Sequence, residues 1–141
     1  MKNSIYAGSN TTALVAANGI VPITTIVHRQ NGNGTSEIDL VGNAIAIETG
    51  CRYRPRYNVD ASITFTGDTT GTASLAIYQD GVLIPFTTKS ETVGTADTEI
   101  HTITIPAAIL TNRCSTTAIT IVNVGTIALN VTNASINVVE Q

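Results

Sequence analysis

The two histidines of the chain are the first residues to consider for acid–base or metal chemistry. His28 and His101 each fall inside a predicted strand. Asp39, Asp60 and Glu99 are candidate partners in principle, but no spacing ties these residues together. Because a catalytic or metal site needs convergent partners, the residues predict no catalytic site, no metal and no cofactor. We therefore expect that the protein is not an enzyme.

Further carboxylates occur in segments rich in Thr, Ser and Gly. These segments contain Ser90-Glu91 and Asp97-Thr98-Glu99. Such a composition favours loops, so we expect these carboxylates to be solvated. The chain contains no Gly-rich phosphate-binding loop and no nucleophile motif.

Cys51 and Cys114 are the only cysteines. They lie too far apart in the sequence for a zinc pair, and neither belongs to a Cys-x-x-Cys motif. A disulfide between them would close a long loop and stabilise the fold by ~4 kcal/mol in the chain-entropy model. Two reduced, buried thiols are an equally acceptable interpretation, so the sequence leaves the pairing open.

Arginines alternate with tyrosines where a long alternating segment begins. This is the densest positive charge in the chain, and Arg and Tyr are both enriched at protein interfaces. The segment could contact a partner or pair with carboxylates across a subunit interface. Alternatively, the arginines only solvate the outer face of a strand, and the sequence does not separate the two. The candidate interface residues are Arg52, Tyr53, Arg54, Arg56 and Tyr57.

The composition indicates a single β-rich domain. The 141 residues suffice for one hydrophobic core, 43% of them are hydrophobic, and only 12% are charged. Thr, Asn, Ser and Gly must supply the polar surface, and these residues favour strands and turns. So little charge does little to keep copies apart, which indicates an oligomer or an assembly component. A domain solvated by Thr and Asn is the alternative.

Charge and hydropathy argue against two kinds of partner. The net charge is −3 and no basic run occurs, which argues against nucleic acid. The apolar run from Ala13 to Ile23 is interrupted by Asn18, Gly19 and Pro22, and it is too short to span a bilayer. No secretory signal is recognisable. We therefore expect no nucleic-acid partner and no membrane partner.

The stretch Ser74–Pro85 carries the clearest local signal. Apolar and polar residues alternate up to Gln79, Asp80-Gly81 follows, and a second apolar run starts at Val82. Asp-Gly favours a type I′ turn because both central residues need positive φ. The pattern therefore predicts a β-hairpin. The residues expected to share its apolar face are Leu75, Ile77, Val82 and Ile84.

Further alternation predicts several short strands. Apolar residues recur at odd numbers from Tyr53 to Phe65, and Pro55 should mark a bulge or an edge there. Such runs with turn residues between them indicate a sandwich or barrel. Residues 1–12 are small and polar, so we expect an N-terminal arm or a frayed end. The domain would then cover residues 13–141.

Three stretches resemble the trimeric jelly-roll fold of the tumour necrosis factor and complement globular-head group. The first is Ile45–Tyr53, a strand followed by Gly and Tyr at the entry to a long strand. The second is the Ser74–Pro85 hairpin, and the third is the closing strand Asn133–Val139. The resemblance implies an all-β, antiparallel jelly-roll β-sandwich that forms a homotrimer.

From Ala13 to Val139 the chain also looks like small structural proteins of phages and prophages of Gram-positive bacteria. The shared features include the opening Val15–Pro22 and the stretch Ile105–Cys114, whereas Phe86 stands where Gly is usual. The resemblance implies a non-enzymatic capsid decoration protein of the head auxiliary or head-fibre kind. It would be assembled in the bacterial host cytoplasm and reside in the virion. Its partners would be itself and the major capsid protein or another virion protein.

A receptor- or carbohydrate-binding tip of a tail fibre or surface filament is the alternative function. Such a tip should cluster aromatic residues on its loops for stacking on sugars. Aromatic residues make up only 4% of the chain and Trp is absent, which weighs against this alternative. An enzyme is a third candidate, and it would require His28, His101 and a carboxylate to converge in one pocket.

Overall fold

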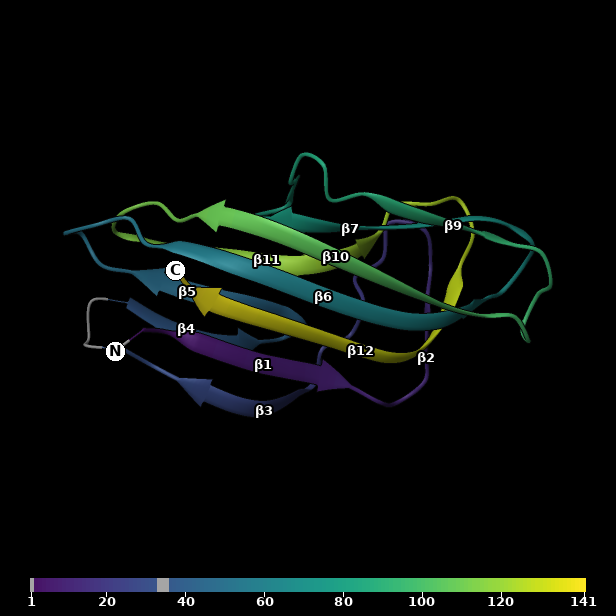
Figure 1. Ribbon diagram of the computed structural model, residues 1–141, viewed down its shortest axis with the longest axis horizontal. Helices are drawn as coiled ribbons and strands as arrows, with labels where there is room; N and C mark the ends of the chain where they lie inside the picture. Colours follow the sequence, from purple (N-terminus) through teal and green to yellow (C-terminus); the bar gives the residue numbers. More distant parts are fainter. Residues whose placement is uncertain (1, 33–35) are drawn as a thin grey trace.

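A computed structural model describes residues 2–32 and 36–141. The chain forms two six-stranded antiparallel sheets that pack face to face (Figure 1). Sheet A contains β1 (Ser4–Ser9), β2 (Ala13–Val15), β3 (Thr25–Gln30), β6 (Arg56–Gly67), β10 (Ile100–Leu110) and β12 (Leu129–Glu140). Sheet B contains β4 (Ser36–Val41), β5 (Ala44–Thr49), β7 (Gly71–Gln79), β8 (Val82–Leu83), β9 (Lys89–Val93) and β11 (Ser115–Asn123). The predicted all-β sandwich is confirmed.

The strand order is that of a sandwich with crossovers between its sheets. Sheet A runs β10-β6-β12-β1-β3, with β2 paired to β12, and sheet B runs β4-β5-β11-β7-β8, with β9 paired to β7. The last strand, β12, therefore lies between β1 and β6 in the middle of sheet A. Both chain ends lie on the same side of the molecule (Figure 1). Among the described residues, no helix has the length and apolar character needed to cross a membrane.

Strand β6 shows why this sequence forms a two-layered fold. Its inward residues are Tyr57, Val59, Ala61, Ile63 and Phe65, all buried, whereas its outward residues are mostly polar. This alternation gives the strand one apolar face to bury. The strand begins at Arg56, after Pro55, which has no N–H to donate to a neighbouring strand. Tyr53 consequently lies outside the strand.

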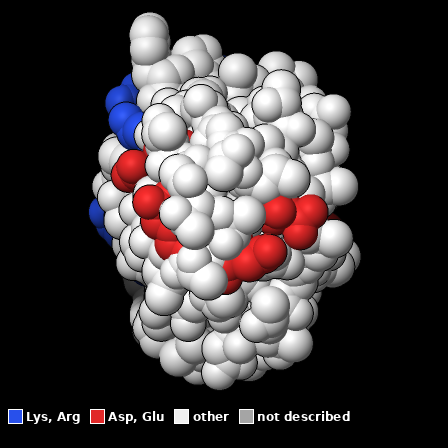
Figure 2. All heavy atoms as spheres, turned by 90° about the vertical axis from the view of Figure 1, so that its right-hand side faces the viewer, with Lys and Arg blue, Asp and Glu red and all other residues white. Residues whose placement is uncertain are grey.

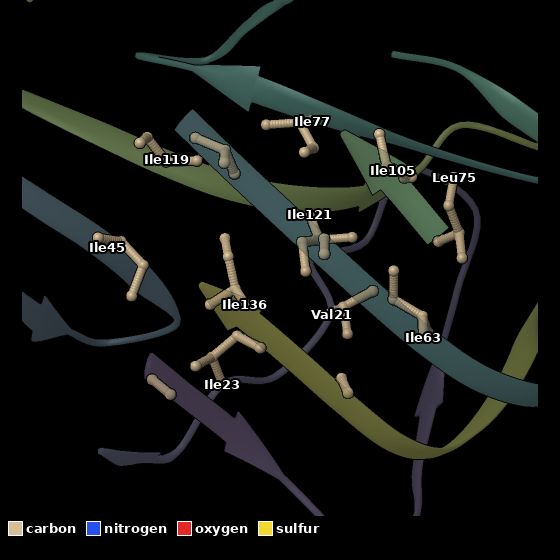
Figure 3. Packing of buried hydrophobic residues seen from close by; sticks show 14 of the residues in the cluster. Val21, Ile23, Ile45, Ile63, Leu75, Ile77, Ile105, Ile119, Ile121 and Ile136 are labelled. Carbon is tan, nitrogen blue, oxygen red and sulfur yellow. The ribbon is translucent and has the colours of Figure 1, made fainter. Parts of the chain in front are cut away.

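The core between the sheets is rich in isoleucine (Figure 3). Sheet A contributes Ile63, Ile105 and Ile136, and sheet B contributes Ile45, Ile77, Ile119 and Ile121. The segment between β2 and β3 adds Val21 and Ile23. β-Branched side chains suit strands because few rotamers are lost there. Each fully buried aliphatic side chain contributes roughly 1.5–3 kcal/mol to stability.

The expected N-terminal arm is replaced by a strand inside sheet A. Strand β1 pairs with β12 on one side and with β3 on the other. Ile5 and Ala7 are fully buried in the core. Gly8 permits close contact with β12, because a Cβ there would lie 2.5 Å from the backbone oxygen of Ala134. The arm prediction is therefore wrong for Ser4–Ser9.

The Asp-Gly hairpin is confirmed in register and turn type. Asp80 and Gly81 have φ values of 53° and 79°, as a type I′ turn requires. Gln79 pairs with Val82, so the predicted face is correct in register. Ile77 is buried, but Val82 is 69% exposed. The difference arises because β8 is an edge strand of only two residues.

Candidate interaction faces

The outer face of sheet A, turned away from sheet B, is a broad surface on which most side chains are uncharged. In one cross-strand row, Thr104, Ser62 and Ser135 are successive partners on β10, β6 and β12. The next row contains Pro106, Asp60, Asn137, Tyr6 and His28. Covering such a surface removes few charges from water, so it can be buried against a partner at low cost.

Two shallow grooves flank Tyr6 on this face. A groove of 230 Å³ is lined by residues of β1, β3 and β12, including Val27 and Asn133. A groove of 440 Å³ lies toward β6 and β10 and is lined by Asp60 and Pro106, among others. Tyr6 and Ser135 line both grooves, and we call Tyr6, the larger of the two, the ridge between them. A ridge beside a groove is a shape that can interlock with a second surface.

Exposed apolar side chains are spread over the same face. Strand alternation turns them outward, because the neighbouring residues of each strand fill the core. Their exposure leaves apolar area that a partner could cover. The residues are Tyr6, Val27, Ile100, Leu110 and Val139.

The arginine-rich segment is a loop rather than a strand face. Strand β6 starts only at Arg56, so Arg52, Arg54 and Arg56 do not line one face as the sequence predicts. The Arg54 Nε donates to the carbonyl oxygen of Thr111 at 3.1 Å, which ties this loop to the segment after β10. Arg52 and Arg56 are exposed. The arginines therefore lie at one end of the sandwich, and any interface that they form would be at that end.

The two tyrosines of this segment occupy different environments. Tyr57 is fully buried, and its hydroxyl oxygen lies 3.0 Å from the Nδ2 of Asn3. It is a core residue because β6 turns its odd-numbered side chains inward, so its prediction as an interface residue is wrong. Tyr53 lies on the loop and is 40% exposed.

Cys51 and Cys114 form a disulfide at the same end of the molecule. Their Cα atoms lie 4.5 Å apart, with a sequence separation of 63 residues. The Cys114 N–H also donates to the carbonyl oxygen of Gly50 at 3.1 Å. The disulfide therefore ties the connection after β5 to the connection after β10. Of the two options left open by the sequence, the structure adopts the disulfide.

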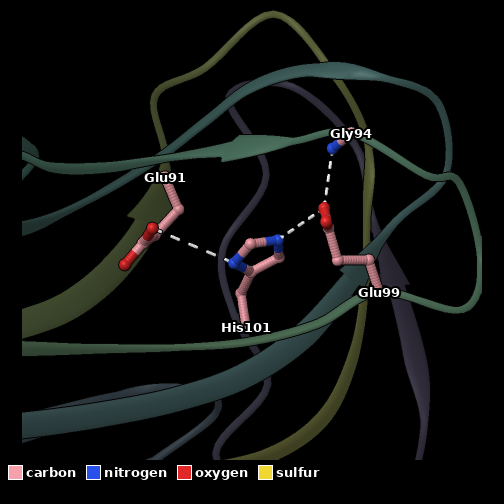
Figure 4. A network of polar contacts seen from close by, with 4 residues as sticks. All are labelled: Glu91, Gly94, Glu99 and His101. Atoms are coloured by element: carbon pink, nitrogen blue, oxygen red, sulfur yellow. Dashed lines mark hydrogen bonds and ion pairs between the residues drawn. The ribbon is translucent and has the colours of Figure 1, made fainter.

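His101 lies between two carboxylates (Figure 4). Its Nε2 is 2.9 Å from the Oε2 of Glu99, and its Nδ1 is 3.9 Å from the Oε2 of Glu91. The same Glu99 oxygen accepts a hydrogen bond from the Gly94 N–H at 2.6 Å. The imidazole also stacks on Phe65, with ring centroids 5.8 Å apart. Glu91 and Glu99, which the sequence predicts to be solvated, thus contact His101 and link β9, β10 and the loop between them.

Within this cluster, the contacts perturb the titration of Glu99. The hydrogen bond from His101 lowers the pKa of the Glu99 carboxyl, and the Gly94 N–H lowers it further. His28 lies on β3, at the opposite edge of sheet A from β10, with its ring against Tyr6. The two histidines therefore do not converge. Within residues 2–32 and 36–141, no group of three or more His, Cys, Asp or Glu side chains could hold a metal ion.

The loop end of the sandwich that is nearest to this cluster is acidic. Figure 2 shows Asp and Glu side chains gathered across that end, with Lys and Arg at its margin. Hydrogen bonds hold the loops there together: the Asp97 N–H donates to Gly67 O at 2.8 Å, and the Asp68 N–H donates to Ala128 O at 3.0 Å. A negative end disfavours contact with a polyanion such as nucleic acid.

Sequence reasoning misses Tyr6, because it assigns the residue to an arm. The signal that could have found it is short: Ile5 and Ala7 alternate with Ser4, Tyr6 and Gly8. This period-2 pattern predicts a strand with Tyr6 on its outward face.

Comparison with solved structures identifies the fold. Murine APRIL matches with a TM-score of 0.67 and 11% sequence identity, covering 100% of both chains. The Eiger TNF from S. frugiperda matches with a TM-score of 0.64 and 9% identity, covering 99% of this chain and 92% of that chain. The PRD1 vertex protein P5 matches with a TM-score of 0.59 and 15% identity, covering 99% and 96%. The fold is therefore a tumour necrosis factor-like jelly roll, as the sequence predicts.

Comparison of the sequence alone finds no match. No family model matches the chain, and no curated protein matches its sequence. The resemblance to structural proteins of phages and prophages of Gram-positive bacteria thus has no sequence match behind it. At 9–15% identity, the structural likeness concerns the fold alone.

Proposed function

We propose that the chain is a non-enzymatic virion structural protein that forms a homotrimer and decorates a phage capsid. The observation that carries the proposal is the outer face of sheet A, whose two rows are mostly uncharged and whose Tyr6 ridge lies between two grooves. The jelly roll shared with the PRD1 vertex protein P5 supports a place in a virion.

Self-association through this face follows from its chemistry and shape. In a closed ring of three, each protomer presents one part of its surface to a different part of the next. The Tyr6 ridge of one protomer then enters the groove beside Asp60 and Pro106 on its neighbour. Covering Ser, Thr and Asn requires less desolvation than covering charges. The exposed apolar side chains add roughly 25 cal/mol per Å² covered.

On a shell, such a trimer acts by binding alone. It sits at a local symmetry point and bridges the subunits beneath it, which resists internal pressure, or it displays a host-facing surface. Ser4–Ser9 form β1 inside sheet A, so these residues do not serve as a docking arm. In this proposal, one end of the sandwich, or a loop that projects from it, contacts the shell.

Co-sedimentation tests this proposal. The purified protein is mixed with empty capsid shells of the phage whose structural genes encode it. We expect saturable binding, with three chains bound at each occupied symmetry position. Absence of binding to intact shells at micromolar protein would contradict the decoration function.

A glycan-binding function is the second candidate, because the groove of 230 Å³ has a suitable lining. Tyr6 offers an aromatic ring, and Asn10, Asn133 and Ser135 offer amide and hydroxyl groups. Such a combination fits a neutral sugar. The two functions exclude each other at Tyr6, since a trimer contact there would cover the groove. A glycan array distinguishes the two functions. If a monomeric protein binds a glycan and Tyr6→Ala abolishes that binding, the glycan-binding function is favoured.

A further inference from the structure

The connection after β7 carries an exposed apolar tip, consisting of Val82, Leu83 and Phe86. Their side chains are 69%, 42% and 98% exposed, respectively. The connection stands out from the body of the sandwich above β7 (Figure 1). Val82 and Leu83 are successive residues of β8, so the tip presents apolar side chains on both sides of the hairpin. Large apolar side chains on a projecting segment indicate a contact surface.

Phe86 is held in a backbone conformation that a bulky residue avoids. Its φ is +67°, in the left-handed region, where Gly would be unstrained. The ring is 98% exposed, so it gains almost no packing within the chain in return. Strain of this kind persists where the surrounding structure fixes it, and it concentrates at binding sites.

The surroundings of Phe86 do fix the tip. The buried Thr87 hydroxyl accepts a hydrogen bond from Ile77 N–H at 3.2 Å and donates to Ile84 O at 2.8 Å. At the other end of the tip, the Asp80 carboxylate accepts the Ala118 N–H at 2.8 Å. The tip is therefore ordered before any partner arrives, which lowers the entropy lost on binding.

We propose that this apolar tip docks into an apolar pocket on the shell protein, an inference that rests on the proposed function. One tip offers too little area to hold a complex alone: an aromatic side chain buries about 150–250 Å², whereas a standard interface needs about 800 Å² per partner. The tips of a trimer together approach that area. Their simultaneous binding multiplies affinity through effective concentration.

Charge favours a protein partner over a lipid surface. Within the segment from Asp80 to Phe86, the charged side chain is a carboxylate rather than Lys or Arg. Anionic lipid surfaces attract segments that carry several basic residues. A neutral apolar pocket needs no such charge.

The variant Phe86→Gly separates binding from folding. Gly accepts the positive φ, so we expect the melting temperature and the solution mass to be unchanged or higher. Binding to empty capsid shells, measured by co-sedimentation, should fall at least tenfold. Leu83→Thr should reduce it by a smaller factor. Val41→Thr is the control, because Val41 is 61% exposed beside another hairpin turn, and it should bind as wild type does.

Four other outcomes would contradict the inference, and each would do so in a different way. Equal binding by Phe86→Gly would leave the decoration function intact and reject the tip as its contact. Failure of the wild-type protein to bind shells would reject the shell partner and the decoration function together. Binding of the wild-type protein to phosphatidylcholine–phosphatidylglycerol vesicles, lost in Phe86→Gly, would assign the tip to a membrane. A concentration-dependent mass above the trimer, lost in Phe86→Gly, would assign it to another copy of the chain.

Discussion

The hydrogen bond between Glu99 and His101 links the fold to pH at the level of single residues. It holds the loop after β9 against β10, and the Gly94 N–H completes the contact. Because His101 lowers the pKa of Glu99, the folded state binds a proton there less readily than the unfolded chain does. The contact therefore contributes stability above the ordinary carboxyl pKa of 4.5 and loses it as the pH falls through the lower, folded value.

The variant Glu99→Gln tests this sign. We expect the melting temperature of the wild-type protein to fall more steeply than that of Glu99→Gln between about pH 5 and about pH 3. Asp68→Asn, which alters an exposed carboxylate on the β6–β7 connection, is the control and should keep the wild-type slope. Parallel curves for the wild type and Glu99→Gln, followed by circular dichroism, would show that the contact does not stabilise the fold.

At the level of elements, the hairpin of β7 and β8 depends on one buried face. Leu75 and Ile77 lie in the core, whereas the paired strand β8 is exposed at the sheet edge. The same hairpin therefore contains a buried position, Ile77, where a charge should prevent folding, and an exposed position, Val82, where a charge should be tolerated.

A charge at Ile77 should prevent folding, because Ile77→Asp would bury an unpaired carboxylate. Val82→Asp, placed on the exposed strand of the same hairpin, is the matched control and should remain soluble and folded. Far-ultraviolet circular dichroism and gel filtration give the readout. A soluble, folded Ile77→Asp protein would mean that the hairpin faces are assigned incorrectly.

The disulfide also contributes to the stability of the fold by linking two connections between strands. Cys51→Ser with Cys114→Ser should lower the free energy of unfolding by about 4 kcal/mol, because the closed loop constrains the unfolded chain. Reduction of the wild-type protein with dithiothreitol should give the same loss in urea titrations. A change below about 1 kcal/mol would indicate that the bond adds little beyond the native contacts.

Elements with strong local patterns were predictable, and those that depend on distant partners were not. The alternation from Tyr57 to Phe65 and the Asp80-Gly81 turn are local signals, and both were predicted correctly. Strand β1 was missed because its partners, β12 and β3, supply its hydrogen bonds. The contact of His101 with Glu91 joins two strands, so spacing along the chain could not reveal it.

At the scale of the whole molecule, the two faces of sheet A have opposite characters. The inner face is apolar and packs against sheet B, whereas the outer face mixes polar residues with the Tyr6 ridge and a few exposed apolar side chains. Neither composition nor periodicity could locate this outer face, because it emerges only when β12 inserts between β1 and β6. Ser62 lies on this face, paired with Thr104 and Ser135.

Light scattering across a dilution series tests the trimer most directly. The wild-type protein should keep a mass near three times 14.7 kDa. Ser62→Lys, which places a charge in the proposed interface, should lower the mass while circular dichroism stays unchanged. Thr116→Lys, on an exposed position of β11 in sheet B, should keep the trimer. A wild-type protein that is monomeric at every concentration, or a Ser62→Lys protein that stays trimeric, would contradict the assignment of this face.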